Sequence, residues 1–176
     1  MRIGIIGGST RQGTIGKGLG DWILSLSQNR KANYELIDLA TFNLPLLGEK
    51  DRGEGAKRWI ETVKNLDGFV FLTAEYNHSI TASLKNALDY PFAEWANKAA
   101  GIISYGYAGG ARATEHLRTI LGALKVADVQ QHLLLNLNTE FEAKVGFKPA
   151  PHQSGLIQKL FDQVEAWAGA LKTLRN

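Results

Sequence analysis

The sequence contains no cysteine among its 176 residues. Disulfides, thiolate nucleophiles, iron–sulfur clusters and cysteine-ligated zinc sites are therefore excluded. The four histidines form neither an HExxH motif nor a pair at i,i+4 spacing, so we expect no metal site. A GxSxG nucleophile motif is lacking as well, which argues against a serine hydrolase.

Long hydrophobic runs are also lacking. The apolar stretches are short and interrupted by Gly, Ser or Asn, so we expect no transmembrane helix and no membrane partner. The sequence MRIGIIGG runs directly into polar residues without a signal-peptide cleavage pattern, which favours a cytoplasmic protein. The formal net charge of +3 is small and not clustered, which argues against nucleic-acid binding and agrees with attraction to small anions.

What the sequence does contain is a regular alternation of strand-like and helix-like segments. Apolar or alternating segments predict five strands, at 2–7, 34–39, 68–73, 99–105 and within 126–135. Apolar residues at intervals of three or four predict five helices, within 15–26, 56–63, 81–88, 117–124 and 156–171. This order is typical of an α/β fold, a doubly wound five-stranded parallel sheet with helices on both faces, in one domain over residues 1–176. Residues 136–153 are expected to be irregular.

Ligands of doubly wound sheets bind at the carboxyl ends of the strands, so the loops at 8–15, 74–80 and 105–110 are the candidate sites. The first loop combines small residues, hydroxyls and Arg11 between a strand and a helix. That composition fits an anion site, because helix N-terminal amides, hydroxyl groups and a guanidinium all attract phosphate. The loop matches neither a Walker A motif nor GxGxxG. The alternative is an ordinary turn in which Thr14 caps the helix.

The second and third loops suit a planar ligand. Tyr76 offers a stacking face in the second loop, although this loop could simply cap the next helix through Ser79 or Thr81. The third segment, from Ser104 to Gly110, has three glycines and two tyrosines. Glycines allow a ligand to approach the backbone closely, but they also suit a plain flexible connection.

Together the three loops resemble the NADPH-dependent FMN reductase family, the flavodoxin-like group that includes chromate, quinone and azo reductases. The family's GSxRxxS turn is matched by residues 8–14, with Thr14 in place of Ser. Its second signature, roughly PEYNxxxPxxLKNAxD, is matched at 75–77 and 84–89, whereas Ala74 and Thr81 replace the two prolines. The likeness covers about residues 1–125.

The resemblance implies an enzyme that binds FMN as cofactor and uses NADPH or NADH as co-substrate. Hydride would pass from the nicotinamide through FMN to a small-molecule acceptor: a quinone, an azo compound, a metal oxyanion or a flavin. The flavin itself supplies this chemistry, so we nominate no catalytic side chain. The resemblance also implies a homodimer or homotetramer that uses the third and fourth helices. Tyr90, Phe92 and Trp95 predict an amphipathic surface there that favours self-association.

The resemblance further implies three groups of FMN-binding residues. The phosphate would be held by Ser9, Arg11, Thr14 and the amide of Ile15. The isoalloxazine would be lined, largely through backbone atoms, by Glu75, Tyr76 and Asn77. The other edge of the ring would be packed by Ser104, Tyr105, Gly106 and Gly109.

Two other functions stay open. A flavodoxin-type electron carrier would share the fold, but such carriers tend to be strongly acidic, and the net charge here is +3. A non-catalytic flavin- or nucleotide-binding module would share the loops without the turnover. Accumulation of the flavin semiquinone on titration would identify a carrier, and the colour of the purified protein and its affinity for FMN would identify the module.

Overall fold

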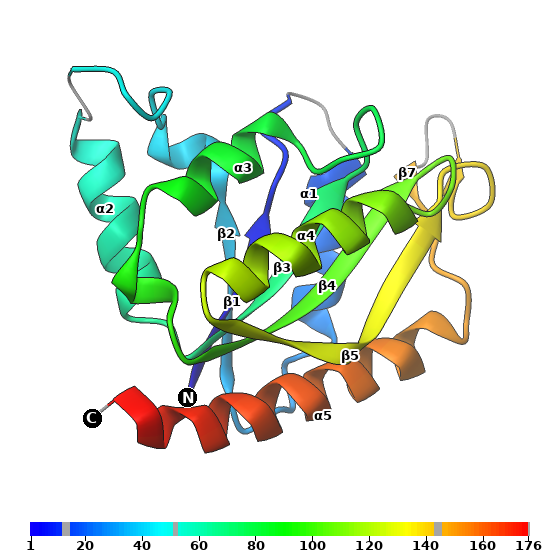
Figure 1. Cartoon of the computed structure of the whole chain (residues 1–176). Coiled ribbons are helices and arrows are strands. Elements are labelled where there is room, and N and C mark those ends of the chain that lie inside the picture. The colour runs from blue at the N-terminus through cyan, green and yellow to red at the C-terminus, as the bar shows by residue number, and fades with distance from the viewer. Residues whose placement is uncertain (12–14, 51–52, 143–145, 176) are drawn as a thin grey trace.

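The computed structural model of the chain describes residues 1–11, 15–50, 53–142 and 146–175 (Figure 1). A parallel sheet with the strand order β2-β1-β3-β4-β5 forms its centre. The strands span Arg2–Gly7 (β1), Asn33–Asp38 (β2), Gly68–Ala74 (β3), Lys98–Gly106 (β4) and Val126–Asn136 (β5). β3 and β4 are buried along their whole length, as expected of central strands covered on both faces.

Helices cover both faces of the sheet, which confirms the predicted doubly wound fold (Figure 1). One face carries α1 (Ile15–Ser25) and α5 (Gln153–Leu171). The other carries α2 (Gly53–Lys64), α3 (Ala82–Asp89) and α4 (Ala111–Ala123). Short 3-10 helices follow β2 (η1, Leu39–Phe42), precede β4 (η2, Ala93–Trp95) and follow α5 (η3, Lys172–Arg175).

The segment 136–153 is more ordered than its sequence suggests. Two short strands, β6 (Phe141–Glu142) and β7 (Gly146–Phe147), pair in an antiparallel ladder. Their aromatic rings pack together, with 5.2 Å between the centroids of Phe141 and Phe147, and Phe147 contacts Trp22 of α1. Two-residue strands are too short to give a period-2 pattern, so the prediction of an irregular segment was wrong here.

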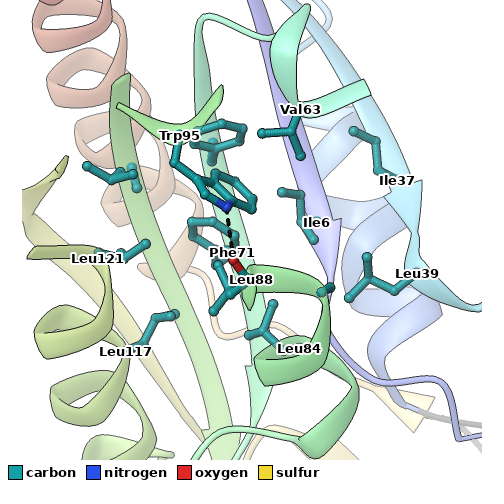
Figure 2. Close-up of a cluster of buried hydrophobic side chains, with 14 of the residues drawn as sticks. Ile6, Ile37, Leu39, Val63, Phe71, Leu84, Leu88, Trp95, Leu117 and Leu121 are labelled. Atoms are coloured by element: carbon teal, nitrogen blue, oxygen red, sulfur yellow. Dashed lines mark hydrogen bonds between the residues drawn. The ribbon is translucent and has the colours of Figure 1, made fainter. Parts of the chain in front are cut away.

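The core on the α2–α3–α4 face is built around Trp95, which is fully buried (Figure 2). Its indole Nε1 donates to the Leu88 carbonyl at 3.0 Å, and Trp59 donates in the same way to Ala87 at 2.7 Å. Because both polar N–H groups find acceptors at the end of α3, the rings can lie in the core without an unpaired donor. The expected amphipathic surface after the third helix is therefore largely wrong: of its three aromatic residues, only Phe92 is exposed.

α5 packs across the opposite face and is fixed to it by a polar cluster. Arg30 donates to Glu165 at 2.8 Å and to Asp162 at 2.7 Å, and the Tyr34 hydroxyl also donates to Glu165. Burial, followed by the nearby Glu165 charge, raises the pKa of Tyr34, so this phenol stays a hydrogen-bond donor. Within the described ranges, no helix has both the length and the apolar character needed to cross a lipid bilayer.

Burial of Trp95 leads to a stability prediction. Trp95→Ala leaves a large cavity between α3, α4 and the sheet and should lower the free energy of unfolding by about 3–5 kcal/mol. Trp167 of α5 is 47% exposed and serves as the matched control, for which Trp167→Ala should cost at most about 1 kcal/mol. Urea unfolding followed by circular dichroism measures both values, and equal losses would contradict the described packing.

Candidate functional site

The three loops singled out in the sequence meet at the carboxyl ends of β1, β3 and β4. These strands are neighbours in the sheet, so the segments that follow them emerge side by side. Backbone hydrogen bonds join them at this edge: the Gly8 amide donates to the Leu72 carbonyl and the Glu75 amide to the Tyr105 carbonyl, both at 2.8 Å. The structure thus brings together residues that lie up to a hundred positions apart in the chain.

The first loop forms the rim of a small cavity at the N-terminus of α1. The cavity has a volume of about 90 Å³ and is lined by Gly7, Gly8, Ser9, Gly16, Lys17, Leu36, Ile37, Asp38, Leu72 and Tyr105. The Ser9 hydroxyl accepts a hydrogen bond from the Arg11 amide at 3.4 Å. Ile15 opens α1, so its amide belongs to the helix N-terminus as expected, whereas Thr14 lies outside the described residues.

Gly8 connects the first loop to β3 and α3. A Cβ at this position would lie 2.8 Å from the Leu72 carbonyl oxygen and 3.1 Å from a Leu84 methyl group, so only glycine fits. The Gly8 carbonyl accepts hydrogen bonds from the Thr81 hydroxyl and, at 2.7 Å, from the Ser83 hydroxyl. Two donors on one buried carbonyl hold the loop against the start of α3.

Thr81, which replaces a proline of the family pattern, also caps α3. Its Oγ1 accepts from the Leu84 amide at 3.2 Å, as an N-cap threonine does, which confirms one of the two predicted caps. Its φ of −65° is the value that proline would impose. Thr81 therefore has the backbone conformation that proline would have, and its hydroxyl adds the hydrogen bond to the Gly8 carbonyl.

The second loop is a tight turn whose tip faces solvent. The amide of Tyr76 donates to the Ser79 carbonyl at 2.9 Å, and the amide of Ser79 donates back at 3.1 Å. Asn77 and His78 between them have φ values of 50° and 70°, the positive pair that a type I′ turn requires. Non-glycine residues held at positive φ are typical of functional segments. The turn leaves the Tyr76 side chain about 40% exposed.

The side chain of Glu75 is almost completely covered, although the residue lines the open cavity. The carboxylate is only 5% exposed and forms an ion pair with Arg112 in the first turn of α4. Arg112 Nε donates to it at 2.5 Å and the Arg112 backbone amide at 3.2 Å. Arg112 was not among the site residues predicted from the sequence. The signal that could have pointed to it is a cation in the first turn of a helix, where acidic residues are favoured.

Two predicted residues of the third segment, Ser104 and Tyr105, lie beneath the loop rather than on its surface. Ser104 is fully buried; its hydroxyl donates to the Gly109 carbonyl at 3.0 Å and pairs with Thr114 Oγ1 at 2.8 Å. Gly110 closes over it with a φ of +78°, where a Cβ would lie 2.6 Å from the Ser104 side chain. Ser104 thus fixes the loop conformation. Gly106 and Gly109 belong to the loop itself, where the Gly109 amide donates to the Gly106 carbonyl at 3.0 Å.

Tyr105 lies under the first loop, 6% exposed, and lines the small cavity at α1. Ser9 lines the same cavity, so Tyr105 brings the third candidate segment up to the first. Burial, followed by the neighbouring Tyr76, raises the pKa of Tyr105 to about 12.

A wide, open cavity lies over the second and third loops. Its volume is about 510 Å³, and its lining residues are Arg11, Glu75, Tyr76, Asn77, His78, Tyr107 and Arg112. Two guanidinium groups and two tyrosine rings give it the chemistry to hold an aromatic anion. Among the described residues, no cluster of three or more acidic or histidine side chains is arranged to hold a metal ion.

A third cavity, of about 360 Å³, lies between the first loop, η1 and α3. Its rim is the Leu44–Leu47 segment, which Asn86 of α3 clamps. Asn86 Nδ2 donates to the Pro45 carbonyl at 2.7 Å, and Asn86 Oδ1 accepts from the Leu47 amide at 2.9 Å. The asparagine of the LKNA segment therefore has a positioning role in this structure.

Comparisons with known proteins agree with these observations. The family model of the NADPH-dependent FMN reductases matches residues 1–140. The NAD(P)H-dependent FMN reductase ntnL of a Nectria species is 33% identical over 130 residues, which is 66% of this chain and 65% of the relative, so the chain spans just under two thirds of that protein. The NAD(P)H-dependent FMN reductase LOT6 of Saccharomyces cerevisiae is 30% identical over 72% of this chain and 76% of its own length.

Solved structures show the same fold. The flavoenzyme NAD(P)H:(acceptor) oxidoreductase FerB from Paracoccus denitrificans superimposes with a TM-score of 0.77, covering 98% of this chain and 97% of that one at 22% identity. The matches confirm the family resemblance drawn from the sequence. With four fifths of its length matched by the family model, the chain belongs to the NADPH-dependent FMN reductase family of flavodoxin-like oxidoreductases.

Proposed function

We propose that this protein transfers hydride from NADPH or NADH through bound FMN to a small acceptor such as a quinone, an azo compound, a metal oxyanion or a free flavin. One observation carries the proposal: an anion-suited loop and an open cavity flanked by Tyr76 and Tyr107 share one edge of the sheet. The whole chain, residues 1–176, would act as a single FMN-binding domain. A cytoplasmic location belongs to the same proposal, and cell fractionation tests it.

The residues at this edge fit FMN. The cavity at the N-terminus of α1 is phosphate-sized, and the helix amides and the hydroxyl of Ser9 are the donors that a phosphate needs. Thr14 and the amide of Ile15 would complete the proposed cradle, and Arg11, which lines the open cavity, would reach the phosphate from that side. The isoalloxazine would lie across the open cavity, against the backbone of Glu75, Tyr76 and Asn77 on one side and that of Gly106 and Gly109 on the other. Ser104 and Tyr105 would support this arrangement from below.

Bound FMN supplies the redox chemistry: it accepts a hydride and passes the electrons on to an acceptor. The chain's own part is to bind and to orient. The type I′ turn and Ser104 hold the backbone of the second and third loops in place, so the amide of Asn77 at the tip of the turn would meet a bound flavin in a fixed orientation. Glu75 has its carboxylate committed to Arg112, so it is not available as an acid or base.

The function predicts a specific spectral change. Protein saturated with FMN should lose its visible flavin absorption within seconds of anaerobic NADPH addition and regain it when a quinone is added. Complete two-electron bleaching is expected. Accumulation of one-electron-reduced flavin during the titration would instead favour a flavodoxin-type carrier, and absence of any bleaching would leave a flavin-binding module.

Arg11 provides a separate prediction about the phosphate cradle. Arg11→Ala should weaken FMN binding by about 1.5–3 kcal/mol, roughly 10- to 150-fold, because one charge-assisted partner of the phosphate is lost. Arg11 is exposed, so its removal leaves no core cavity. Riboflavin lacks the phosphate and serves as the control ligand. Fluorescence titrations with each flavin measure the two affinities, and equal losses would remove Arg11 from the phosphate site.

A homodimer or homotetramer is also part of the proposal. Phe92, which follows α3, is 88% exposed, and Leu46 on the neighbouring loop is 68% exposed; such side chains favour burial against a second copy. Light scattering should give at least twice the chain mass of 19.3 kDa at micromolar concentration. Phe92→Glu should lower that mass toward the monomer without unfolding the protein. A wild-type value near 19 kDa would exclude the assembly.

A further inference from the structure

The ion pair between Glu75 and Arg112 joins a covered carboxylate to a half-exposed guanidinium. Glu75 follows the central strand β3 with its side chain 5% exposed, and Arg112 supplies both a side-chain and a backbone donor to it. Burying a carboxylate is costly unless it is paired, and one well-placed guanidinium meets that need. The part of Arg112 that Glu75 does not cover is free to meet a ligand.

Arg112 faces the open cavity. Its side chain is 46% exposed, whereas that of Glu75 is nearly covered, so the positive member of the pair is the one that a ligand meets. The cavity is lined by two guanidinium groups and a single carboxylate, which leaves a net positive charge at its surface. Tyr107, 77% exposed, adds an unused aromatic face beside it.

We propose that Arg112, fixed in place by Glu75, is the anchor for the phosphate groups of the nicotinamide dinucleotide, an assignment that rests on the proposed function. The FMN phosphate is assigned to the small cavity at the N-terminus of α1, which is lined by residues other than Arg112. The dinucleotide carries its own phosphates, which must lie beyond the flavin ring when the nicotinamide reaches that ring. Arg112 lines the open cavity from the α4 side and is placed for this second anion.

Glu75 is a positioning residue in this arrangement. A free arginine side chain loses rotamer freedom when it binds a phosphate, and that loss weakens binding. Glu75 holds Nε and the backbone amide of Arg112 at once, so the guanidinium is oriented before the ligand arrives. Arginine can hold a carboxylate and a phosphate together because its planar group presents five donors.

The test uses three hydride donors and two pairs of variants. NADPH and NADH differ in the 2′-phosphate, and dihydronicotinamide riboside has no phosphate at all. Arg112→Leu and Glu75→Gln probe the pair, and the double variant avoids a buried carboxylate left without its partner. Arg2→Leu and Glu35→Gln are matched controls, since Arg2 and Glu35 form an exposed ion pair at the opposite end of the sheet.

The proposal predicts a selective loss. In Arg112→Leu and the double variant, KM for NADPH should rise about 10- to 100-fold, whereas KM for the riboside and the FMN dissociation constant should change far less. Glu75→Gln should raise KM for NADPH about 3- to 10-fold, more than it raises KM for the riboside. Calorimetric titration of the oxidised holoprotein with NADP⁺ measures binding without turnover. The dissociation constants of the variants should follow the same order as their KM values for NADPH. The Arg2 and Glu35 variants should match the wild type.

Each outcome decides a separate question. An equal rise for NADH and NADPH assigns Arg112 to the diphosphate, and a larger rise for NADPH assigns it to the 2′-phosphate. Equal loss with the riboside, a parallel loss of FMN affinity, or no change in NADPH and NADP⁺ binding overturns the proposal. Failure of wild-type holoprotein to be reduced by any of the three donors overturns the proposed function instead.

Discussion

The position of β1 between β2 and β3 is the constraint on which the rest of the site depends. The chain leaves β1 through α1 on one face to reach β2, and returns through α2 on the other face to reach β3. The connections therefore diverge above β1, and a crevice opens at its carboxyl end. Gly8 sits at that point, and its amide and carbonyl are both bonded to the β3–α3 side. Gly8 is thus held on the side of β3 and α3.

Rigidity at this edge comes from hydroxyl groups and glycines rather than from prolines. Thr81 reproduces the φ of proline and gains two hydrogen bonds, and Ser104 fills the space that Gly110 leaves. Fixed backbone donors stabilise developing charge better than mobile ones, because no reorganisation is needed when the charge appears. A redox site without a nominated catalytic side chain depends on this kind of support, since binding and orientation are the protein's main contribution.

Charge at the site is divided between two places. The N-terminus of α1 carries the helix dipole and Ser9, while Glu75 and Arg112 lie across the open cavity at the N-terminus of α4. A flavin mononucleotide and a nicotinamide dinucleotide each bring their own phosphates. Under the proposed function, the α1 N-terminus and the Arg112 side of the open cavity would serve different phosphates, and a mild net charge of +3 favours the approach of anions.

The amino-acid sequence by itself determined the order of strands and helices, the doubly wound fold and the three loops of the site, because local periodicity and glycine-rich turns encode these directly. The tertiary structure decided which side chains face the ligand. Ser104 and Tyr105 were expected to pack against the edge of the flavin ring, yet both belong to β4 and lie beneath the surface, and Trp95 is core rather than interface. Glu75 finds its partner Arg112 thirty-seven positions away. Such pairings depend on which strands are neighbours, and no local pattern in the chain specifies that.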